Sequence, residues 1–240
     1  MKISVALAAY KGEKYLGEQL ESILPQLGEM DEIIVSDDFP EGETRAVVEF
    51  YHAYDNRIKY IHGPGKGVCK NFENAILNCT GDYIFLCDQD DVWLPNKVEF
   101  MVKELENNSD LVMHNAMVTD GKLQIIHKSY FDSHKTHQGF VSNFMRNNYV
   151  GCCMAFKADF KDIFLPFPEN LPMHDQWIGL LVELYGRVSL IDEPLILYRR
   201  HSNTVTGAST SFGQKLKWRF NLAGELLKRT SLVKKNRGAK

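Results

Sequence analysis

Residues 81–93 read GDYIFLCDQDDVW, in which an apolar run typical of a buried strand leads directly into three carboxylates. Like charges repel, so bringing Asp88, Asp90 and Asp91 together gains nothing for folding itself. Such clusters usually persist where something positive binds, and the next basic residue along the chain is Lys97. The stretch therefore predicts a strand whose carboxyl end holds a hard divalent cation, Mn²⁺ or Mg²⁺, through oxygen ligands. The alternative is a solvated turn that caps the following helix.

Short apolar runs alternate with helical periodicity on both sides of this stretch. Strands are expected at 3–9, 32–36, 58–62, 82–87 and 110–118, and helices from Glu13, over 44–54, over 68–78 and from Pro95. Such alternation predicts an α/β, Rossmann-like fold with a doubly wound, mostly parallel sheet. Ligands bind beyond the carboxyl ends of strands in sheets of this kind. We therefore expect one crevice to collect the polar residues at those ends, which are 8–10, 37–38, His62 and 88–91.

The second half of the chain is less regular. We expect a loop-rich insertion over 119–150, a strand over 152–156, a helix over 175–185 and two short strands across 188–199, separated by Pro194. No apolar run is long enough to span a bilayer, and the amino terminus lacks the layout of a signal peptide. Five cysteines without a CxxC pair are typical of reduced, mostly buried thiols in a cytosolic protein.

Charge is distributed unevenly along the chain. From Phe212 to Lys240 there are nine lysine and arginine residues and one acid, Glu225, whereas the other 211 residues hold 19 bases and 30 acids. A mildly acidic body would repel phosphate, which argues against bulk nucleic-acid binding. The basic tail predicts a negatively charged partner for this segment alone, such as an anionic membrane surface. A helix with Leu216, Phe220 and Leu227 on one side is one interpretation of the tail, and a solvated, disordered terminus is the other.

Several motifs in order give the chain a resemblance to a known family. It resembles the family 2 glycosyltransferases, which have the GT-A fold, particularly the bacterial enzymes that build surface polysaccharides. The motifs that carry the resemblance are SVALAAYKGEKYLGEQLESIL (4–24), DEIIVSDD (31–38), GVCKNFENAI (67–76), GDYIFLCDQDDVW (81–93), HDQW (174–177) and YRRHSNTVTG (198–207). The resemblance implies a GT-A domain over 1–207, with a nucleotide-sugar-binding half at 1–118 and a smaller, mixed acceptor half at 119–207. The basic tail over 208–240 would follow it.

The resemblance also implies roles at matching positions. Asp175 matches the catalytic base, and Asp90 and Asp88 match metal ligands, with His201 as a further ligand from the later segment. The nucleotide-sugar donor would be held by Ala9, Tyr10, Asp38, Gly67, Asn71, Asp88 and Gln89. The acceptor would be faced by Trp93, His174 and Trp177. The residues also have interpretations that do not depend on the resemblance. In these, Asp175 caps a helix, His201 is a surface histidine, and Trp93 and Trp177 are core residues.

The activity that the resemblance implies is a cytoplasmic, metal-dependent, inverting transfer of one hexosyl or deoxyhexosyl unit. The donor would be a UDP- or dTDP-sugar, and the acceptor a glycan or lipid-linked glycan. The motif of processive synthases and membrane helices are both absent from the sequence, which favours single transfer. Two departures from the family pattern are FPEGET (39–44) after SDD, and His174 where an acid commonly precedes the base.

Two other functions fit parts of the same sequence. A sugar nucleotidyltransferase shares a related sheet and an acidic metal site, but it needs a Gly-rich, basic loop after the first strand, where this chain has AAYKGEKY (8–15). A nucleotide-sugar-binding module without catalysis is the other alternative. It would bind donor but show no turnover, and the FPEGET loop and His174 are the features that favour it.

Overall fold

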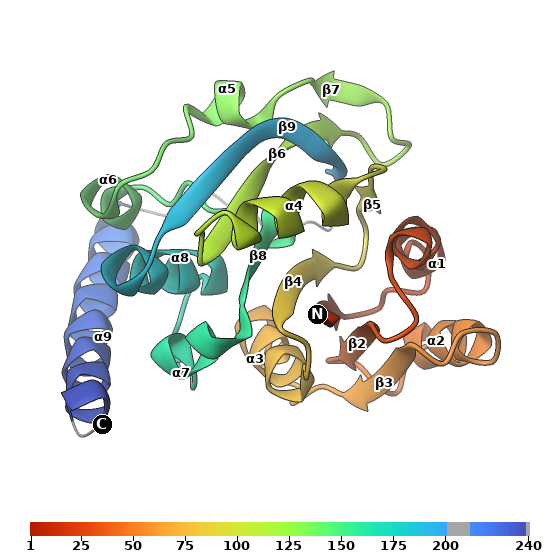
Figure 1. Ribbon diagram of the computed structural model, residues 1–240, viewed down its shortest axis with the longest axis horizontal. Helices are drawn as coiled ribbons and strands as arrows, with labels where there is room; N and C mark the ends of the chain where they lie inside the picture. The colour runs from red at the N-terminus through yellow and green to blue at the C-terminus, as the bar shows by residue number, and fades with distance from the viewer. Residues whose placement is uncertain (201–211, 239–240) are drawn as a thin grey trace.

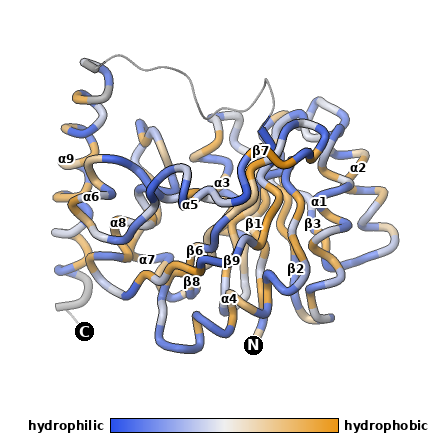
Figure 2. Tube along the Cα trace, turned by 90° about the horizontal axis from the view of Figure 1, so that it is seen from above, coloured by the Kyte–Doolittle hydropathy of each residue, from blue (hydrophilic) through white to orange (hydrophobic). Residues whose placement is uncertain are grey.

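The structure, a computed structural model, describes residues 1–200 and 212–238. A curled sheet of nine strands forms its centre, in the order β3-β2-β1-β4-β8-β6-β9-β5, with β7 paired to β6 (Figure 1). Apolar strands occupy the middle of the molecule in Figure 2 and hydrophilic segments surround them. The α/β fold with a mostly parallel sheet predicted from the sequence is confirmed.

The first half is a parallel, doubly wound unit. The strands β1 (Ile3–Ala9), β2 (Glu32–Asp37), β3 (Ile58–His62) and β4 (Tyr83–Asp88) pair in parallel. The helices that connect them are α1 (Leu16–Ile23), α2 (Thr44–His52) and α3 (Val68–Asn78). Strand order reverses between β1 and β4, so right-handed crossovers place α1 and α2 on one face and α3 on the other (Figure 1). All seven residues of β1 are buried because both faces of the sheet are covered.

The second half joins this unit through an antiparallel strand. The short strand β8 (Met154–Lys157) lies between β4 and β6 (Leu111–Thr119) and runs antiparallel to both. The expected fifth strand is therefore present but does not neighbour β4. Between β4 and β6 the chain forms β5 (Val92–Trp93) and α4 (Lys97–Glu106), and after β8 it forms α7 (Lys161–Phe164) and α8 (His174–Tyr185).

One expectation for this half needs correction. Residues 188–199 form one strand, β9 (Val188–Arg199), rather than two. Pro194 lies opposite Asn115 at a shift in the register between β6 and β9, where a residue without an N–H is tolerated. The insertion over 119–150 holds three short elements: β7 (Ile125–His127), α5 (Tyr130–His134) and α6 (Phe140–Met145).

The basic tail forms a long helix, α9 (Phe212–Gly238), beside α6 and α8 (Figure 1). The helical interpretation of the tail therefore holds for these residues, and the side with the apolar row is exposed: Leu216 is 42%, Phe220 70% and Leu227 69% accessible. The buried side chains are Leu222, Leu226 and Val233. Among the described residues, no helix combines the length and the apolar composition that crossing a bilayer requires.

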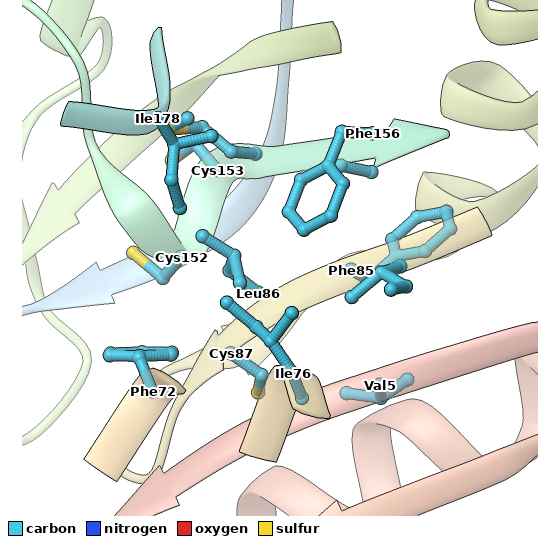
Figure 3. Packing of buried hydrophobic residues seen from close by; sticks show 14 of the residues in the cluster. Val5, Phe72, Ile76, Phe85, Leu86, Cys87, Cys152, Cys153, Phe156 and Ile178 are labelled. Atoms are coloured by element: carbon cyan, nitrogen blue, oxygen red, sulfur yellow. The ribbon is translucent and has the colours of Figure 1, made fainter. Parts of the chain in front are cut away.

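The core is continuous beneath the carboxyl ends of the strands. Figure 3 shows Ile76 of α3 on one side of β4, and Cys152, Phe156 and Ile178 on the other. The cysteines are free thiols and all but Cys69 are buried, as the sequence predicts.

Candidate functional site

The carboxyl ends of the parallel strands meet at one edge of the sheet. Ala9 lies opposite Asp37, Ala8 opposite Asp88, and Asp37 opposite His62. This register confirms the expectation that the polar residues at the strand ends share one place. The edge includes the junction of β1 and β4, where strand order reverses and where open α/β sheets bind ligands.

Asp38 fixes the loop that leads into α3. Its two carboxylate oxygens each accept a backbone N–H, from Gly65 and from Gly67, at 2.7 Å. Both glycines have positive φ, +65° and +86°, which side-chain-bearing residues rarely adopt. A carboxylate oxygen has two lone pairs, so Asp38 keeps the capacity to accept a further donor.

Asn71 lies inside the fold rather than in the crevice. It is 2% exposed, and its Nδ2 donates to the carbonyl oxygens of Ala9 and Ser36 at 2.9 Å. Its Oδ1 accepts the Ser36 hydroxyl at 2.6 Å. Because both amide hydrogens are used within the protein, the expected direct contact of Asn71 with the donor is corrected. Asn71 instead positions the ends of β1 and β2.

A second amide links the ends of β1 and β4. Gln89 donates from Nε2 to the Tyr10 carbonyl at 2.9 Å and accepts the Tyr10 N–H on Oε1 at 2.8 Å. A side chain at Gly12 would place its Cβ 2.4 Å from Gln89 Oε1, which explains a glycine there. The Tyr10 ring is 53% exposed and meets Phe39 edge-on at 5.7 Å. An aromatic pair therefore stands beside Asp38, and the altered FPEGET loop supplies half of it.

The acid cluster is partly buried and contains an unpaired oxygen. Ligand atoms of Asp88, Asp91 and Cys152 lie within 4.8 Å of one another. Asp91 is 1% exposed; its Oδ1 accepts the Arg199 N–H at 2.9 Å, while its Oδ2 has no partner among the described residues. Burial and the neighbouring Asp90 charge raise the pKa of Asp88 to about 7, and burial and Asp88 raise the pKa of Asp91 well above its usual value. Two clustered carboxylates with an orphaned oxygen fit a hard divalent cation. Asp90, the ligand expected from the sequence, is not a member of this group of ligand atoms among the described residues.

A buried lysine lies behind this cluster, although the sequence suggested that no base is nearby. Lys97 is fully buried, and its Nζ donates to the Cys152 carbonyl at 2.8 Å and lies 4.1 Å from the Trp93 ring. Burial lowers the pKa of Lys97, and the charge of Asp91 is among the groups that oppose this shift. The acids therefore face an internal cation on the core side.

Arg199 holds the acidic turn in place and does not reach into the crevice. It is 3% exposed, and its Nε donates to the Asp90 carbonyl at 2.6 Å while Nη1 donates to Gly121 at 3.0 Å. Its guanidinium also pairs with Glu18 of α1. These contacts give Arg199 a structural role at the acidic turn.

Asp175 lies in the first turn of α8 with a pKa near neutrality. Its Oδ1 accepts the Gln176 N–H at 2.6 Å and Asn147 Nδ2 at 3.1 Å. Burial raises the pKa of Asp175 to about 6. Its charge also raises the pKa of Asp88, so the two carboxyl groups interact electrostatically. The helix N-cap is Met173, which makes no side-chain cap, so Asp175 supports the first turn without being the cap residue.

Three residues expected at the acceptor are buried. Trp177 is 1% exposed and its indole donates to the Phe164 carbonyl at 2.9 Å, and Trp93 is 3% exposed. The structure corrects both assignments: these rings pack in the core and are not open to a sugar. His174 is 9% exposed and stacks on Phe72 at 4.1 Å, and burial lowers its pKa to about 3, so it is neutral.

Some residues near the acids could not be predicted from the sequence, and one predicted ligand lies outside the described residues. Asn147 reaches Asp175 from the expected loop-rich insertion, Cys152 reaches Asp88 and Asp91 from the start of an expected strand, and Lys97 looked like an ordinary helix residue. These residues are identified as part of the site only because the structure places them close to the carboxylates. His201, expected as a metal ligand, lies outside the described residues.

Comparison with known proteins agrees with this geometry. The sequence model described as Glycosyl transferase family 2 matches residues 4–164. The chain is 28% identical over 228 residues to the dTDP-rhamnosyl transferase RfbG of Shigella flexneri, which covers 88% of this chain and 77% of the relative.

Solved structures show the same fold. TarS of S. aureus in complex with UDP-GlcNAc matches with a TM-score of 0.72 and 19% identity, covering 95% of this chain and 72% of that chain. The mannosyltransferase PcManGT of Pyrobaculum calidifontis, in complex with GDP-Man and Mn²⁺, matches with a TM-score of 0.60 and 14% identity, covering 85% of this chain and 58% of that chain. The fold is therefore GT-A, and because the family match spans well over half of the 240 residues, the chain belongs to glycosyl transferase family 2.

Proposed function

We propose that this protein moves one hexosyl or deoxyhexosyl unit from a UDP- or dTDP-sugar to a glycan or lipid-linked glycan, with inversion and without processive elongation. The family and a dTDP-rhamnosyl transferase relative support the reaction class. We place the reaction in surface polysaccharide synthesis, in the cytoplasm at the inner face of the membrane, where a lipid-linked acceptor would be held. The observation that carries the proposal is the acid cluster at the point where strand order reverses, with a buried, unpaired Asp91 oxygen.

The donor would lie along the edge formed by β1, β2 and β4. The exposed Tyr10 ring and Ala9 would pack on the base or ribose, and Asp38, oriented by Gly65 and Gly67, would accept the ring N–H of a pyrimidine. The diphosphate would approach Asp88 and Gln89. Asp90 and Asp88, with His201 as a further expected ligand, would hold Mn²⁺ or Mg²⁺, which neutralises charge on the leaving diphosphate when bound.

Asp175 would act as the general base. Its carboxylate would take the proton of the acceptor hydroxyl as that oxygen bonds to the anomeric carbon and the diphosphate leaves. The carboxyl group lies at the amino end of α8, held by Asn147 and the Gln176 N–H, so its orientation is fixed. Attack from the face opposite the diphosphate inverts the configuration in a single displacement, with no covalent intermediate on the protein.

The donor site is tested by calorimetric titration with UDP and dTDP, each with and without Mn²⁺. We expect one nucleotide to bind far more tightly with metal, and Asp90→Ala to remove that gain by taking away a ligand. Asp159→Ala is the matched control because Asp159 is an exposed acid just after β8, whose Lys157 pairs with Tyr83 at the amino end of β4, away from the carboxyl ends of the parallel strands. If neither nucleotide binds with metal present, the proposed donor site is wrong and the acid cluster is a solvated turn.

The pH dependence follows from the raised pKa of Asp175. A base must be ionised, so kcat/KM is expected to fall about tenfold per pH unit below a pH near 6 and to level off above it. An enzyme whose catalytic aspartate had the ordinary pKa would keep its kcat/KM down to a pH of about 4. A pH–rate profile of the wild-type enzyme checks this, and a profile that stays flat to that lower limit would exclude Asp175 as the titrating base.

A binding module without catalysis remains the second candidate, favoured by the neutral, buried His174 where an acid commonly stands. It would show the same metal-dependent nucleotide binding but release no nucleoside diphosphate from any donor sugar. The nucleotidyltransferase alternative has no observation in its favour, since the family match is to glycosyl transferases.

A further inference from the structure

One face of α9 is attached to the body by polar and apolar contacts. Arg219 donates to the Met145 carbonyl of α6, with Nη2 at 2.6 Å, and Arg229 donates to the carbonyl oxygens of Leu165 and Pro166. The hydroxyl of Tyr185 in α8 donates to the Thr230 carbonyl at 3.3 Å. These contacts fix the rotation of the helix about its axis, so the face that points outward is determined.

The outward face presents a row of apolar side chains. Leu216, Phe220 and Leu227 are 42%, 70% and 69% exposed. In an α-helix each residue advances by 100°, so these three positions fall within an arc of about 40°. A row of exposed apolar residues along more than two turns is unusual for a surface that only meets water.

A row of lysines runs beside the apolar row. Lys217, Lys228 and Lys235 are all exposed and fall within an arc of about 20°, which begins about 60° around the helix axis from the nearest apolar residue. Figure 1 shows α9 at the end of the molecule formed by α6 and α8, far from α2 and β3. The two rows together are called the outer face of α9.

We propose that the outer face of α9 docks on an anionic lipid bilayer. Lysines beside a narrow Phe/Leu row match a helix that lies in the membrane interface, with apolar side chains in the acyl boundary and ammonium groups at the phosphates. The row is one side chain wide and about 16 Å long, too small for the roughly 800 Å² per partner of a stable protein interface. Docking places the end of the molecule formed by α6 and α8 toward the membrane.

This inference deepens the proposed function, on which it rests for the location of the acceptor. Lipid binding itself is measured without donor or acceptor, so either proposal can fail alone.

The test is sedimentation with phosphatidylcholine vesicles, with and without phosphatidylglycerol, at low and high salt. Wild-type protein is expected to bind only the anionic vesicles and to be released by salt. Phe220→Ser with Leu227→Ser is expected to weaken binding about tenfold or more, because both side chains lose apolar burial. Replacing Lys217, Lys228 and Lys235 by glutamine is expected to weaken it about 100-fold, since each lysine near an anionic leaflet contributes about fivefold.

Matched controls distinguish binding through the outer face of α9 from non-specific binding of the protein to vesicles. Phe50→Ser removes a 60% exposed aromatic from α2, and glutamine at Lys103, Lys122 and Lys128 removes the same charge elsewhere. Neither control should change vesicle binding. The proposal is overturned if wild-type protein ignores anionic vesicles, or if the α9 variants bind as tightly as the controls. It is also overturned if Phe220→Ser with Leu227→Ser converts a dimer to a monomer in sedimentation velocity and leaves lipid binding unchanged, because a second copy would then cover this face.

Discussion

Asp175→Asn is expected to lower kcat by about 10³-fold while leaving nucleotide affinity unchanged. Asparagine keeps the side-chain shape and an oxygen that can accept the Gln176 N–H and Asn147 Nδ2. It cannot take a proton from the acceptor hydroxyl at neutral pH, so only the chemical step should suffer. Turnover is followed as nucleoside diphosphate released from UDP- and dTDP-sugars with a panel of glycan and lipid-linked acceptors, beside calorimetric titration of the nucleotide.

The same variant separates catalysis from helix support. If Asp175 serves only the first turn of α8, Asp175→Asn should change the melting temperature and leave kcat nearly intact. Asp159→Asn, at an exposed site, is the matched control and should change neither quantity. Equal turnover by wild type and Asp175→Asn would remove the general base from the proposal.

Lys97→Met is expected to lower the free energy of unfolding by about 3–5 kcal/mol, the cost of removing one member of a buried set of charges. The side chain is fully buried and its ammonium binds the Cys152 carbonyl beside Asp88 and Asp91. Methionine fills most of the volume but leaves that carbonyl without its donor and the acids without their internal cation. Urea denaturation at neutral pH, without metal, measures the loss.

A double-mutant cycle shows whether the effect is electrostatic. Adding Asp91→Asn to Lys97→Met should recover part of the lost stability, because the second change removes the buried negative charge that the first leaves uncompensated. The recovery should shrink at lower pH, where protonation neutralises Asp91, whose pKa is already raised. Strictly additive losses at all pH values would show that Lys97 acts through packing and its bond to Cys152 alone.

Local patterns were enough to predict the parallel half and the place of the site. The strand Ile58–His62 and the helix Val68–Asn78 begin and end where the apolar periodicity does. Parallel strands bring their carboxyl ends together, so the meeting of Asp37 and Asp88 with Ala8 and Ala9 followed from topology alone.

Contacts between distant segments could not be predicted in this way. Whether Trp177 or Lys97 is buried depends on what packs over it, and Trp177 is covered by α7 while Lys97 meets the segment before β8. The rotation of α9 about its axis depends on such contacts as well: the bonds from Arg219 and Arg229 set it, so that Phe220 faces outward.

The antiparallel strand β8 has a further consequence in evolutionary terms. In the described sheet, the β4–β8 ladder is the hydrogen-bonded connection between the four parallel strands of the first half and the strands of the second half. Phe85 and Ile84 face Ala155 and Phe156 there, so the seam between the two halves is short and apolar. A recombination that preserves the β4–β8 pairing can replace the second half of the fold as a unit. Under the proposed function, such an exchange would alter the acceptor side and leave the donor side unchanged.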